Sequence, residues 1–401
     1  MKGIEVRLAD ICEVITKGTT PSNIGEEFTT DGVRYIRSEM INSSKNISEE
    51  GVLYISEETH DKLKRSQLKS GDILFSMAGV YLGKTAILRE RDVPANTNQA
   101  VALIRVNPKK CNREYIYYFL NLPAIVKSVN SMTAQAAQPN INLRQIGNIP
   151  IVLPPQEVQD RVVAVISPYD DLIENNQRQI KLLEEAARRV YKEWFVDLRF
   201  PGHENTKITD GIPEGWSLSS VGKICTLKKE TVVLTRIPAN TPYIGLEYMP
   251  RGDFCLSSWG NAENATSNKF LYAVDDIVFA KIRPYFHKVG FTLNNGIAST
   301  DSFVMKANEG LWGLLLMTVF DKSFVDYTCQ TCKEGAKMPR ADWSQMEKYS
   351  VLIPNENIRK QFEDYIWKVT RQIRTLALQN RILSEARDRL LPKLMNGEIE
   401  V

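Results

Sequence analysis

Two long stretches of this sequence carry apolar residues at alternating spacings of three and four, the pattern of helices that pack lengthwise against another helix. The seam of the first stretch consists of Ile166, Tyr169, Ile173, Asn176, Ile180, Leu183, Ala187, Val190 and Trp194. The seam of the second, about two hundred residues later, consists of Ile366, Val369, Ile373, Leu376, Asn380, Leu383, Arg387, Leu390 and Leu394. Because two matched seams can bury each other, we expect the helices to form an antiparallel coiled coil. The alternative is two unrelated helices that each pack on their own domain.

Two features interrupt these seams. Asn176 and Asn380 are polar residues in otherwise apolar seams, and such residues often fix the register of a coiled coil at some cost in stability. Pro168 lacks the N–H that an α-helix uses at an interior position, so we expect a kink or break near Ser167 and a regular helix over residues 169–198. A helix of about 40 residues would span roughly 60 Å.

The sequence that precedes each helix is repeated. The matching segments, in chain order, are residues 8–12 with 221–225, 33–36 with 241–244, 71–75 with 275–279, 138–142 with 338–342, and 151–154 with 351–354. Tyr81 and Lys84 also correspond to Tyr285 and Lys288. The order is kept throughout while the offset between the copies drifts smoothly, which indicates a tandem duplication.

Each repeated half is predicted to be a mixed α/β domain in which strands predominate. The clearest strands of the first half are residues 33–37, 72–76, 85–88 and 101–106, each bounded by Gly, Asn, Pro or charged residues. One amphipathic helix is expected from residue 113 to about 130, with its counterpart from 311 to about 329. The fold class is therefore α+β, without a doubly wound sheet. The predicted divisions are a first domain at 1–153, a first long helix at 154–200, a second domain at 201–353, and a second long helix with a tail at 354–401.

Composition restricts the function only weakly. A hydrophobic content of 43% and a charged content of 25% are typical of a soluble globular protein, and no segment approaches the roughly 20 apolar residues of a membrane helix. The net charge of +3 is only mildly basic, so any DNA-binding surface must be local. The start of the sequence has no apolar signal region, and six scattered cysteines suit reduced thiols, so we expect a cytoplasmic protein.

The order of these elements resembles that of the specificity (S) subunits of type I DNA restriction–modification enzymes. The segments that carry the resemblance are Gln138-Pro-Asn-Ile141, Ile151-Val-Leu-Pro-Pro155, Leu182-Leu-Glu-Glu-Ala-Ala-Arg188 with Tyr191-Lys-Glu-Trp-Phe-Val196, and Leu390-Leu-Pro-Lys-Leu-Met-Asn-Gly-Glu-Ile399. The resemblance covers essentially the whole chain. The sequence departs from the family at Pro168, inside a helix that the family usually keeps continuous. It also has Asn355 where the first copy has Pro155.

The resemblance implies a non-catalytic DNA-binding protein. In that family each globular half is a target-recognition domain that reads one part of a split DNA site. The long helices set the separation of the domains and dock two modification (methyltransferase) subunits, to which restriction subunits can attach. This chain would bind double-stranded DNA and no cofactor, while the partner methyltransferase would use S-adenosylmethionine. Because the two halves have diverged outside framework positions, we expect the full site to be asymmetric.

Polar, basic and aromatic residues in turn-like stretches are the candidates for DNA contact, because side chains read base edges while Lys and Arg bind phosphates. In the first half they are Thr19, Ser22, Arg37, Ser38, Tyr81, Lys84, Asn96, Asn98 and Gln99. In the second half they are Tyr243, Arg251, Lys281, Arg283, Tyr285, Lys288, Asp301, Lys337 and Arg340. The ordinary alternative for each residue is a solvent-exposed turn without a ligand.

Other functions have weaker support in the sequence. Residues 78–85 fit a relaxed P-loop, which would make the chain a nucleotide-binding enzyme, but a strand rather than a helix is predicted to follow and the second copy has no glycine there. Cys329 and Cys332 form a lone CxxC pair without further ligands nearby, so no metal site is expected. A coiled-coil scaffold without DNA affinity is the remaining alternative.

Overall fold

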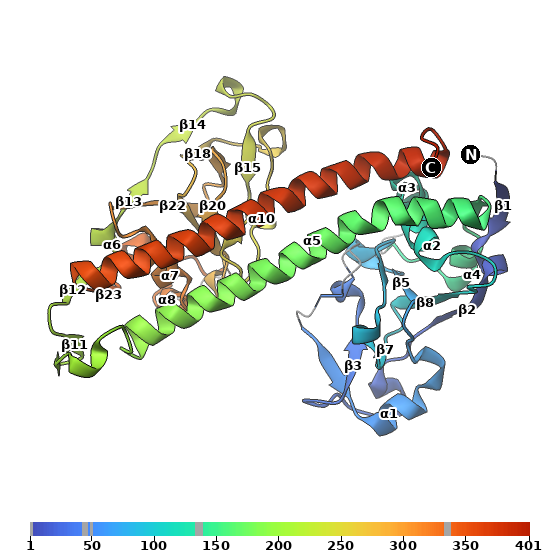
Figure 1. The fold of residues 1–401 in the computed structure, drawn as a ribbon, viewed down its shortest axis with the longest axis horizontal. Helices are drawn as coiled ribbons and strands as arrows, with labels where there is room; N and C mark the ends of the chain where they lie inside the picture. Colours follow the sequence, from blue (N-terminus) through green and yellow to red (C-terminus); the bar gives the residue numbers. More distant parts are fainter. Residues whose placement is uncertain (1–2, 42–46, 49–50, 133–138, 333–337) are drawn as a thin grey trace. The chain divides into compact units, whose positions relative to one another are not determined.

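The computed structural model describes residues 3–41, 47–48, 51–132, 139–332 and 338–401, which form two compact units (Figure 1). The first unit contains Met1–Glu174 and Ile382–Val401, and the second contains Asn175–Arg381. Each unit consists of a strand-rich domain and parts of both long helices. The predicted α+β class is confirmed. Among the described residues, no helix combines the length and apolar character needed to cross a bilayer.

The first unit is built on two sheets and one separate strand pair. The strand pair is β1 (Ile4–Arg7) with β9 (Pro150–Leu153). One sheet has the order β2 (Cys12–Lys17), β8 (Val101–Val106), β5 (Ile73–Ser76), β6 (Thr85–Ile87), and the other has the order β4 (Leu53–Ile55), β3 (Val33–Ile36), β7 (Ala95–Thr97). The helices of this domain are α1 (Glu57–Lys62), α2 (Arg113–Leu120), α3 (Pro123–Ser131) and α4 (Leu143–Gly147). The four strands predicted from the sequence are confirmed to within one residue at either end.

The second unit repeats this plan with longer sheets. Its separate strand pair is β12 (Ser217–Ser220) with β23 (Ser350–Ile353). One sheet has the order β13 (Cys225–Lys228), β22 (Ser302–Ala307), β19 (Ile277–Ala280), β20 (Val289–Thr292), β16 (Cys255–Leu256). The other has the order β14 (Thr231–Val232), β18 (Lys269–Tyr272), β21 (Gly296–Ala298), β15 (Pro242–Ile244), β17 (Gly260–Asn261). A small hairpin joins β10 (Ile208–Thr209) to β11 (Ile212–Pro213), and the domain helices are α6 (Val221–Ile224), α7 (Trp312–Phe320), α8 (Lys322–Gln330) and α9 (Trp343–Met346).

The single amphipathic helix expected in each domain is wrong, because each is divided into two helices. In the first unit α2 ends before Asn121, and Pro123 opens α3 at a position where its missing N–H costs nothing. In the second unit Asp321 separates α7 from α8, and its carboxylate caps α8 by accepting a hydrogen bond from the backbone N–H of Ser323 at 2.9 Å. The hydrophobic pattern continues across both breaks, so it did not reveal them.

The long helices are α5 (Gln156–Tyr191) and α10 (Glu356–Asn396). Of the predicted kink or break near Ser167, the break is wrong: α5 remains α-helical through Pro168. On either side of Pro168, Ile166 and Asp170 are buried, and this packing outweighs the loss of one backbone hydrogen bond. The predicted end at residue 198 is also too late. The α-helix ends at Tyr191, one turn of π-helix covers Lys192–Val196, and Leu198 then adopts a left-handed conformation.

Residues of both seams take part in the domain cores. In the first unit Val162 and Ile166 of α5 join Leu391 and Leu394 of α10 in the largest core cluster of that unit. The corresponding cluster of the second unit contains Ala187 of α5 with Phe362, Ile366, Val369, Ile373 and Ala377 of α10, and Ile180, Leu183 and Val190 pack against it. Each long helix therefore contributes to the cores of both units, so the alternative in which each helix packs only on its own domain is wrong.

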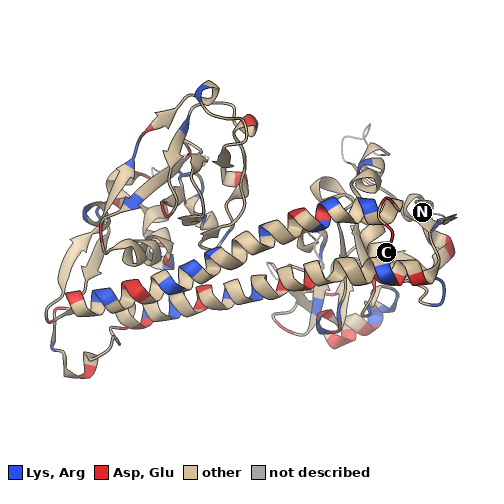
Figure 2. Ribbon diagram, turned by 45° about the horizontal axis from the view of Figure 1, so that its top comes forward, with Lys and Arg blue, Asp and Glu red and all other residues tan. Residues whose placement is uncertain are grey.

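Contacts between the two seams occur as well. In the second unit the Asn176 side chain donates a hydrogen bond to the Asn380 carbonyl oxygen at 2.9 Å. Ile173 and Leu376 are buried, whereas Leu383 and Leu390 are half-buried. Lys and Arg are interspersed with Asp and Glu along both long helices (Figure 2), and exposed ion pairs include Lys360–Glu356 and Lys368–Asp364, both at 2.6 Å. The helix faces that carry such exposed pairs, here called the outer faces, are solvated surfaces with mixed charge.

Candidate nucleic-acid interface

A tight turn joins β5 to β6 in the first unit, and we call residues 77–84 the first hairpin turn. Gly79 and Gly83 have φ angles of 65° and 80°, in the left-handed region that favours glycine, and a short 3-10 helix begins at Gly79 and ends at Tyr81. The backbone N–H of Leu82 donates to the Gly79 carbonyl at 3.1 Å, and that of Gly83 donates to Ser76 at 3.0 Å. Val80 at its tip is 87% exposed.

The second unit has the same turn between β19 and β20, and we call residues 281–288 the second hairpin turn. Its left-handed residues are Arg283 and His287, with φ angles of 50° and 51°, on either side of the 3-10 helix Pro284–Phe286. The N–H of Phe286 donates to the Arg283 carbonyl at 2.9 Å. Each non-glycine residue in this conformation costs about 1–2 kcal/mol, so the surrounding structure must enforce it. The most exposed side chain is Tyr285, at 55%.

Each hairpin turn is tied to the segment that precedes α4 or α9. In the first unit the N–H of Gly79 donates to the Pro139 carbonyl at 3.0 Å, and the N–H of Ile141 donates to Met77 at 2.9 Å. In the second unit the equivalent bonds run from Arg283 to Pro339 at 2.9 Å and from Ala341 to Lys281 at 2.8 Å. These segments are the repeated residues 138–142 and 338–342, of which Gln138 lies outside the described residues. The repeat is therefore preserved in the backbone contacts of the turns.

The geometry of residues 78–85 is that of a hairpin and not of a P-loop. The segment leads from β5 into β6, so no helix N-terminus follows to hold a phosphate. Lys84 lies over the ring of Tyr81 at 5.1 Å, as part of the hairpin. The nucleotide-binding alternative is therefore wrong.

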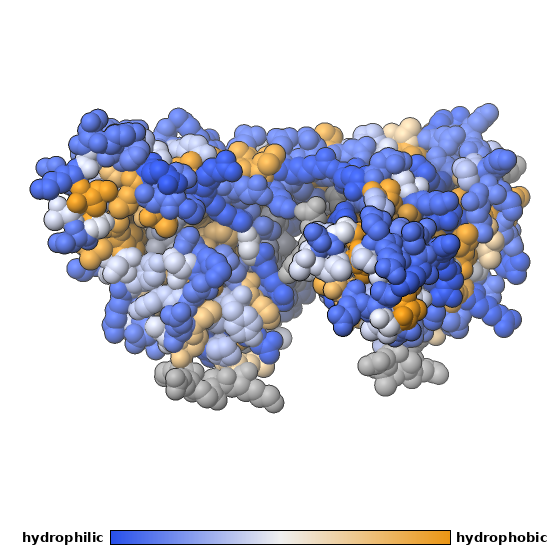
Figure 3. Space-filling view, turned by 90° about the horizontal axis from the view of Figure 1, so that it is seen from below, coloured by the Kyte–Doolittle hydropathy of each residue, from blue (hydrophilic) through white to orange (hydrophobic). Residues whose placement is uncertain are grey.

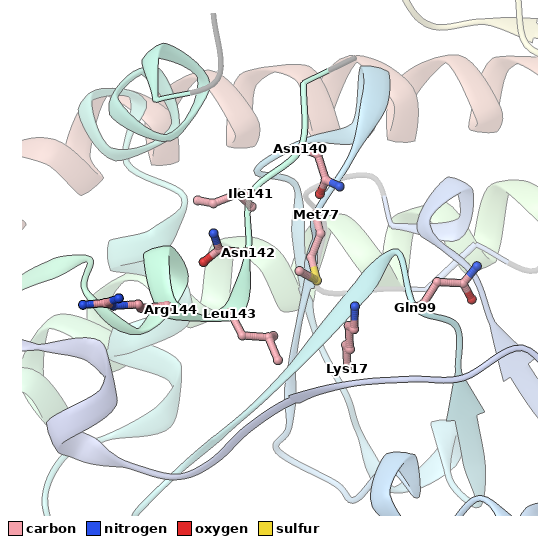
Figure 4. Close-up of a pocket in the computed structure, with 8 residues that line it drawn as sticks. All are labelled: Lys17, Met77, Gln99, Asn140, Ile141, Asn142, Leu143 and Arg144. Atoms are coloured by element: carbon pink, nitrogen blue, oxygen red, sulfur yellow. The ribbon is translucent and has the colours of Figure 1, made fainter. Parts of the chain in front are cut away.

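A pocket of about 590 Å³ opens beside the first hairpin turn (Figure 4). It is lined by Lys17, Met77, Gln99, Asn140, Ile141, Asn142, Leu143 and Arg144. Asn142 caps α4, since its side chain accepts from the N–H of Gln145 at 2.9 Å. In Figure 4 the Lys17 side chain points towards Met77 and Arg144 extends at the outer edge. The described lining contains two cationic and three amide side chains and no carboxylate, which suits an anionic or polar ligand.

Several predicted contact residues of the first unit are held by other parts of the chain. The Thr19 hydroxyl accepts from Arg65 at 3.2 Å, and Arg37 pairs with Glu39 at 2.8 Å. The prediction that Asn96 lies in an exposed turn is wrong. It belongs to β7, is fully buried, and its side-chain oxygen accepts from the Ser66 hydroxyl at 2.5 Å.

The other first-unit candidates remain at the surface or partly covered. Ser22 is exposed, while Ser38 is half-buried. The side-chain oxygen of Asn98 accepts from the N–H of Ala100 at 3.2 Å. Gln99 is exposed, accepts from the Thr20 hydroxyl and lines the pocket.

In the second unit, basic residues gather around the second hairpin turn. The Arg251 guanidinium lies 4.0 Å from the ring centre of Phe286, and that of Arg283 lies 5.9 Å from it. The Lys288 ammonium donates to the Leu246 carbonyl at 2.5 Å, and burial lowers its pKa. Arg251 and Arg283 form one continuous group with Phe286 and with Tyr285, whose ring meets Phe286 edge-on at 4.9 Å.

The remaining candidates of the second unit are engaged in separate hydrogen bonds or ion pairs, or are buried. Lys281 donates to the Thr300 carbonyl at 2.8 Å, and burial lowers the pKa of its ammonium group. Asp301 pairs with Arg340 at 2.6 Å. Tyr243 is only 8% exposed, and burial raises the pKa of its phenol. Lys337 lies outside the described residues.

Sequence reasoning missed several residues of these surfaces. Lys17, Asn140 and Arg144 line the pocket although they lie on a strand, on a repeated segment and on a short helix, none of which reads as a binding loop. Val80 was missed because an apolar residue is normally assigned to the core. The sequence did contain one indication that Val80 is exposed: it directly follows Gly79 in a tight hairpin turn.

The CxxC pair has no metal-binding partners within the described part of the chain. Cys329 and Cys332 are free thiols, and burial raises the pKa of both. Over the described ranges, no group of three or more His, Cys, Asp or Glu side chains is arranged to hold a metal ion. Cys329 lies in α8 and Cys332 lies just after it.

Residues 1–185 match the family described as type I restriction modification DNA specificity domain. The chain is 25% identical to the specificity subunit of the type I restriction enzyme MjaIX from Methanocaldococcus jannaschii, over 98% of this chain and 93% of that protein. It is 22% identical to the specificity subunit of HindI from Haemophilus influenzae, over 65% of this chain and 71% of that protein.

The fold is also similar to a solved structure. The crystal structure of the type I restriction–modification S subunit from M. genitalium superposes with a TM-score of 0.59 at 12% sequence identity, covering 98% of this chain and 96% of that chain. The likeness of the fold agrees with the likeness of the sequence. The chain is therefore similar in sequence and in fold to the specificity subunits of type I restriction–modification enzymes, and these similarities support its identification as such a subunit.

Proposed function

We propose that this chain reads a split, asymmetric DNA site with its two domains, 1–153 and 201–353, and positions two methyltransferase subunits. The observation that carries the proposal is the hairpin turn that occurs in both units with the same backbone bonds and different side chains. Because the backbone of the hairpin turn is repeated, each domain can approach DNA in the same way. Different side chains on that frame would read different bases, which makes the site asymmetric.

The long helices, 154–200 and 354–401 with their flanking residues, would act as an antiparallel coiled coil between the recognition domains. Two contacts support this arrangement. Asn176 bonds to Asn380 in the second unit, and Asp170 pairs with Arg387 at 2.6 Å in the first. From Asn176 to Asp170 the residue number falls along α5, whereas from Asn380 to Arg387 it rises along α10. Antiparallel helices require this opposite order. A polar pair in the seam would fix the register.

Catalysis in the complex would belong to the partners. The methyltransferase subunits would bind S-adenosylmethionine, and this chain would bind no cofactor. Restriction subunits would attach through the methyltransferase. The mixed-charge outer faces of α5 and α10 are the surfaces that remain for these subunits once the seams are buried.

Sequencing of modified bases in the host genome tests the proposal. Deletion of the gene should remove one modified motif that consists of two different half-sites separated by an unspecified spacer. Expression of the intact gene from a plasmid should restore the same motif. Persistence of every motif after deletion would refute the proposal, and a single contiguous or palindromic motif would refute the assignment of one half-site to each domain.

The pocket beside the first hairpin turn yields a prediction about phosphate contacts. Replacing Lys17 and Arg144 together by alanine should lower DNA affinity uniformly across sequences. It should also reduce the slope of log affinity against log salt by roughly 2, because each lost phosphate contact removes about 0.9 from that slope. Titration of duplex DNA into the complex of this chain with its methyltransferase subunits, at several salt concentrations, measures both effects.

The matched control is the double variant Lys360→Ala and Lys368→Ala. It removes the same formal charge, but both lysines pair with carboxylates on the outer face of α10. Its salt slope should equal that of the parent. Equal losses in the two double variants would show that only total charge matters, and absence of any salt-dependent DNA binding by the parent would favour the scaffold without DNA affinity.

A further inference from the structure

The two hairpin turns combine apolar exposure with a rigid backbone. Val80 is the most exposed of the large hydrophobic residues in the described chain, and Tyr285 is more than half exposed. Figure 3 shows a surface that is mainly hydrophilic, with separate hydrophobic patches. Single exposed apolar residues are ordinary on protein surfaces. Exposure at the tip of a turn whose conformation is fixed from several sides is not ordinary, since loop tips are usually polar and mobile.

The backbone of the second hairpin turn is held in a conformation that its residues disfavour. Arg283 and His287 are both left-handed, although neither is glycine. The His287 ring is fixed by a 2.6 Å contact from its Nε2 to the Phe320 carbonyl and lies 4.5 Å from the Phe320 ring. Strained residues of this kind persist where the surroundings enforce them and concentrate at functional sites. The turn presents Tyr285 in one orientation before any ligand binds.

The immediate surroundings of the tips are basic. Lys84 lies against Tyr81 in the first turn, and Arg251 and Arg283 lie against Phe286 in the second. DNA interfaces combine cations that bind phosphates with apolar or polar side chains that meet base edges in the groove. Each turn contains both components within a few residues.

We infer that the two hairpin turns determine specificity, one for each half-site, with Val80 and Tyr285 as the side chains that meet the bases. The inference rests on the proposed function and assigns it to particular residues. Val80 has no hydrogen-bonding atom in its side chain, so it can distinguish bases only through an apolar feature of the base edge. In the major groove that feature is the C5-methyl group of thymine. The first half-site must therefore contain a thymine that contacts Val80.

The test uses the complex of the full chain with its methyltransferase subunits and DNA that carries the genomic motif. Val80→Ser should change base preference in one half-site only, and Tyr285→Ser should change it in the other half-site only, as measured by selection from a library randomised at every motif position. Ile4→Ser and Leu218→Ser serve as controls, because these residues are 66% and 59% exposed on β1 and β12, outside the two hairpin turns. Both controls should keep the parental motif.

Uracil substitution tests the methyl contact directly. Replacing one thymine at a time in the first half-site by uracil removes only its methyl group. One replacement should weaken binding by the parent about fourfold, the value of one buried methyl group. The same replacement should leave binding by Val80→Ser unchanged.

The outcomes separate the inference from the proposed function. Parental motifs for both variants, changes in the same half-site, or a first half-site without a methyl-sensitive thymine would each overturn the inference while leaving the proposed function intact. Absence of sequence-specific binding by the parent complex would overturn both. Folding of each variant is checked by its thermal unfolding and by its assembly with the methyltransferase subunits.

Discussion

Replacement of Asp170 by alanine is expected to destabilise the first unit by about 3–5 kcal/mol, the usual cost of breaking a buried ion pair by removing one partner. Asp170 on α5 accepts a hydrogen bond from the Tyr118 hydroxyl of α2 at 2.7 Å and pairs with Arg387 of α10 at 2.6 Å. Only 8% of Asp170 is exposed. The loss would be a large share of the ~5–15 kcal/mol that stabilises a typical domain. Amide hydrogen exchange in α2, compared with urea unfolding of the whole chain, measures the effect.

A triple variant separates loss of the charge pair from loss of packing. Asp170→Leu, Arg387→Met and Tyr118→Phe together replace the buried polar group by apolar side chains and leave no buried partner unpaired. Such replacements are often neutral or stabilising, so the triple variant should be markedly more stable than Asp170→Ala alone. Equal destabilisation by the single and triple variants would show that the polar contacts do not hold α2, α5 and α10 together.

Glu184 is expected to make the stability of the second unit depend on pH. It lies on α5, is 1% exposed, and accepts hydrogen bonds from the N–H groups of Phe254 and Cys255 at 3.0 and 3.2 Å. Burial raises the pKa of its carboxyl group from 4.5 to about 8, and the carboxylate of Asp253 adds to the shift. The Arg188 guanidinium and the two N–H groups oppose it.

The raised pKa determines the direction of the effect. Between pH 4.5 and about 8 the folded chain keeps the Glu184 proton while the unfolded chain has lost it. This contribution to stability is therefore complete below pH 4.5 and is lost as the pH rises through about 8, at up to about 1.4 kcal/mol per pH unit. Glu184→Gln keeps an oxygen that accepts both N–H bonds but does not titrate. The variant should therefore gain stability relative to the parent as the pH rises from 5 to 8.

Urea unfolding at several pH values, followed by hydrogen exchange near β16, measures this difference. Glu185→Gln is the matched control, because it makes the same chemical change on the exposed face of α5. The stability difference between this control and the parent should stay nearly constant with pH. A constant difference between Glu184→Gln and the parent would contradict the assignment of the pH dependence to Glu184.

Much of the fold could be predicted because it depends on regular spacing. The heptad positions located both long helices, since a seam that must stay buried over many turns restricts every third or fourth residue. The strands β5 and β8 were found because each is a short β-rich run bounded by Gly, Asn, Pro or charged residues. The break between α2 and α3 was not, because the apolar pattern continues through Asn121. Continuity of α5 through Pro168 depends on the packing of Ile166 and Asp170, which no local rule contains.

The candidate interface was predicted less well, because it depends on which turns are rigid and which residues they cover. Tyr81, Lys84, Tyr285 and Lys288 were chosen from the repeat, and all four lie on the paired hairpin turns. Asn96 resembled a turn residue but faces the interior of the first unit. Side-chain partners such as Arg65 for Thr19 come from distant parts of the chain, and one sequence does not reveal them.

The chain segments that make up the two units have a consequence for synthesis on the ribosome. The second unit is one continuous stretch, Asn175–Arg381, so all of its residues have been made once residue 381 has been added. The core of the first unit needs Leu391, Leu394 and Met395. These residues are made only after the whole second unit. Domains usually fold in the order in which they are translated. In this protein the unit that is begun first is completed last, so a nascent chain exposes part of the first unit's core until the last turns of α10, with Leu391, Leu394 and Met395, have been made.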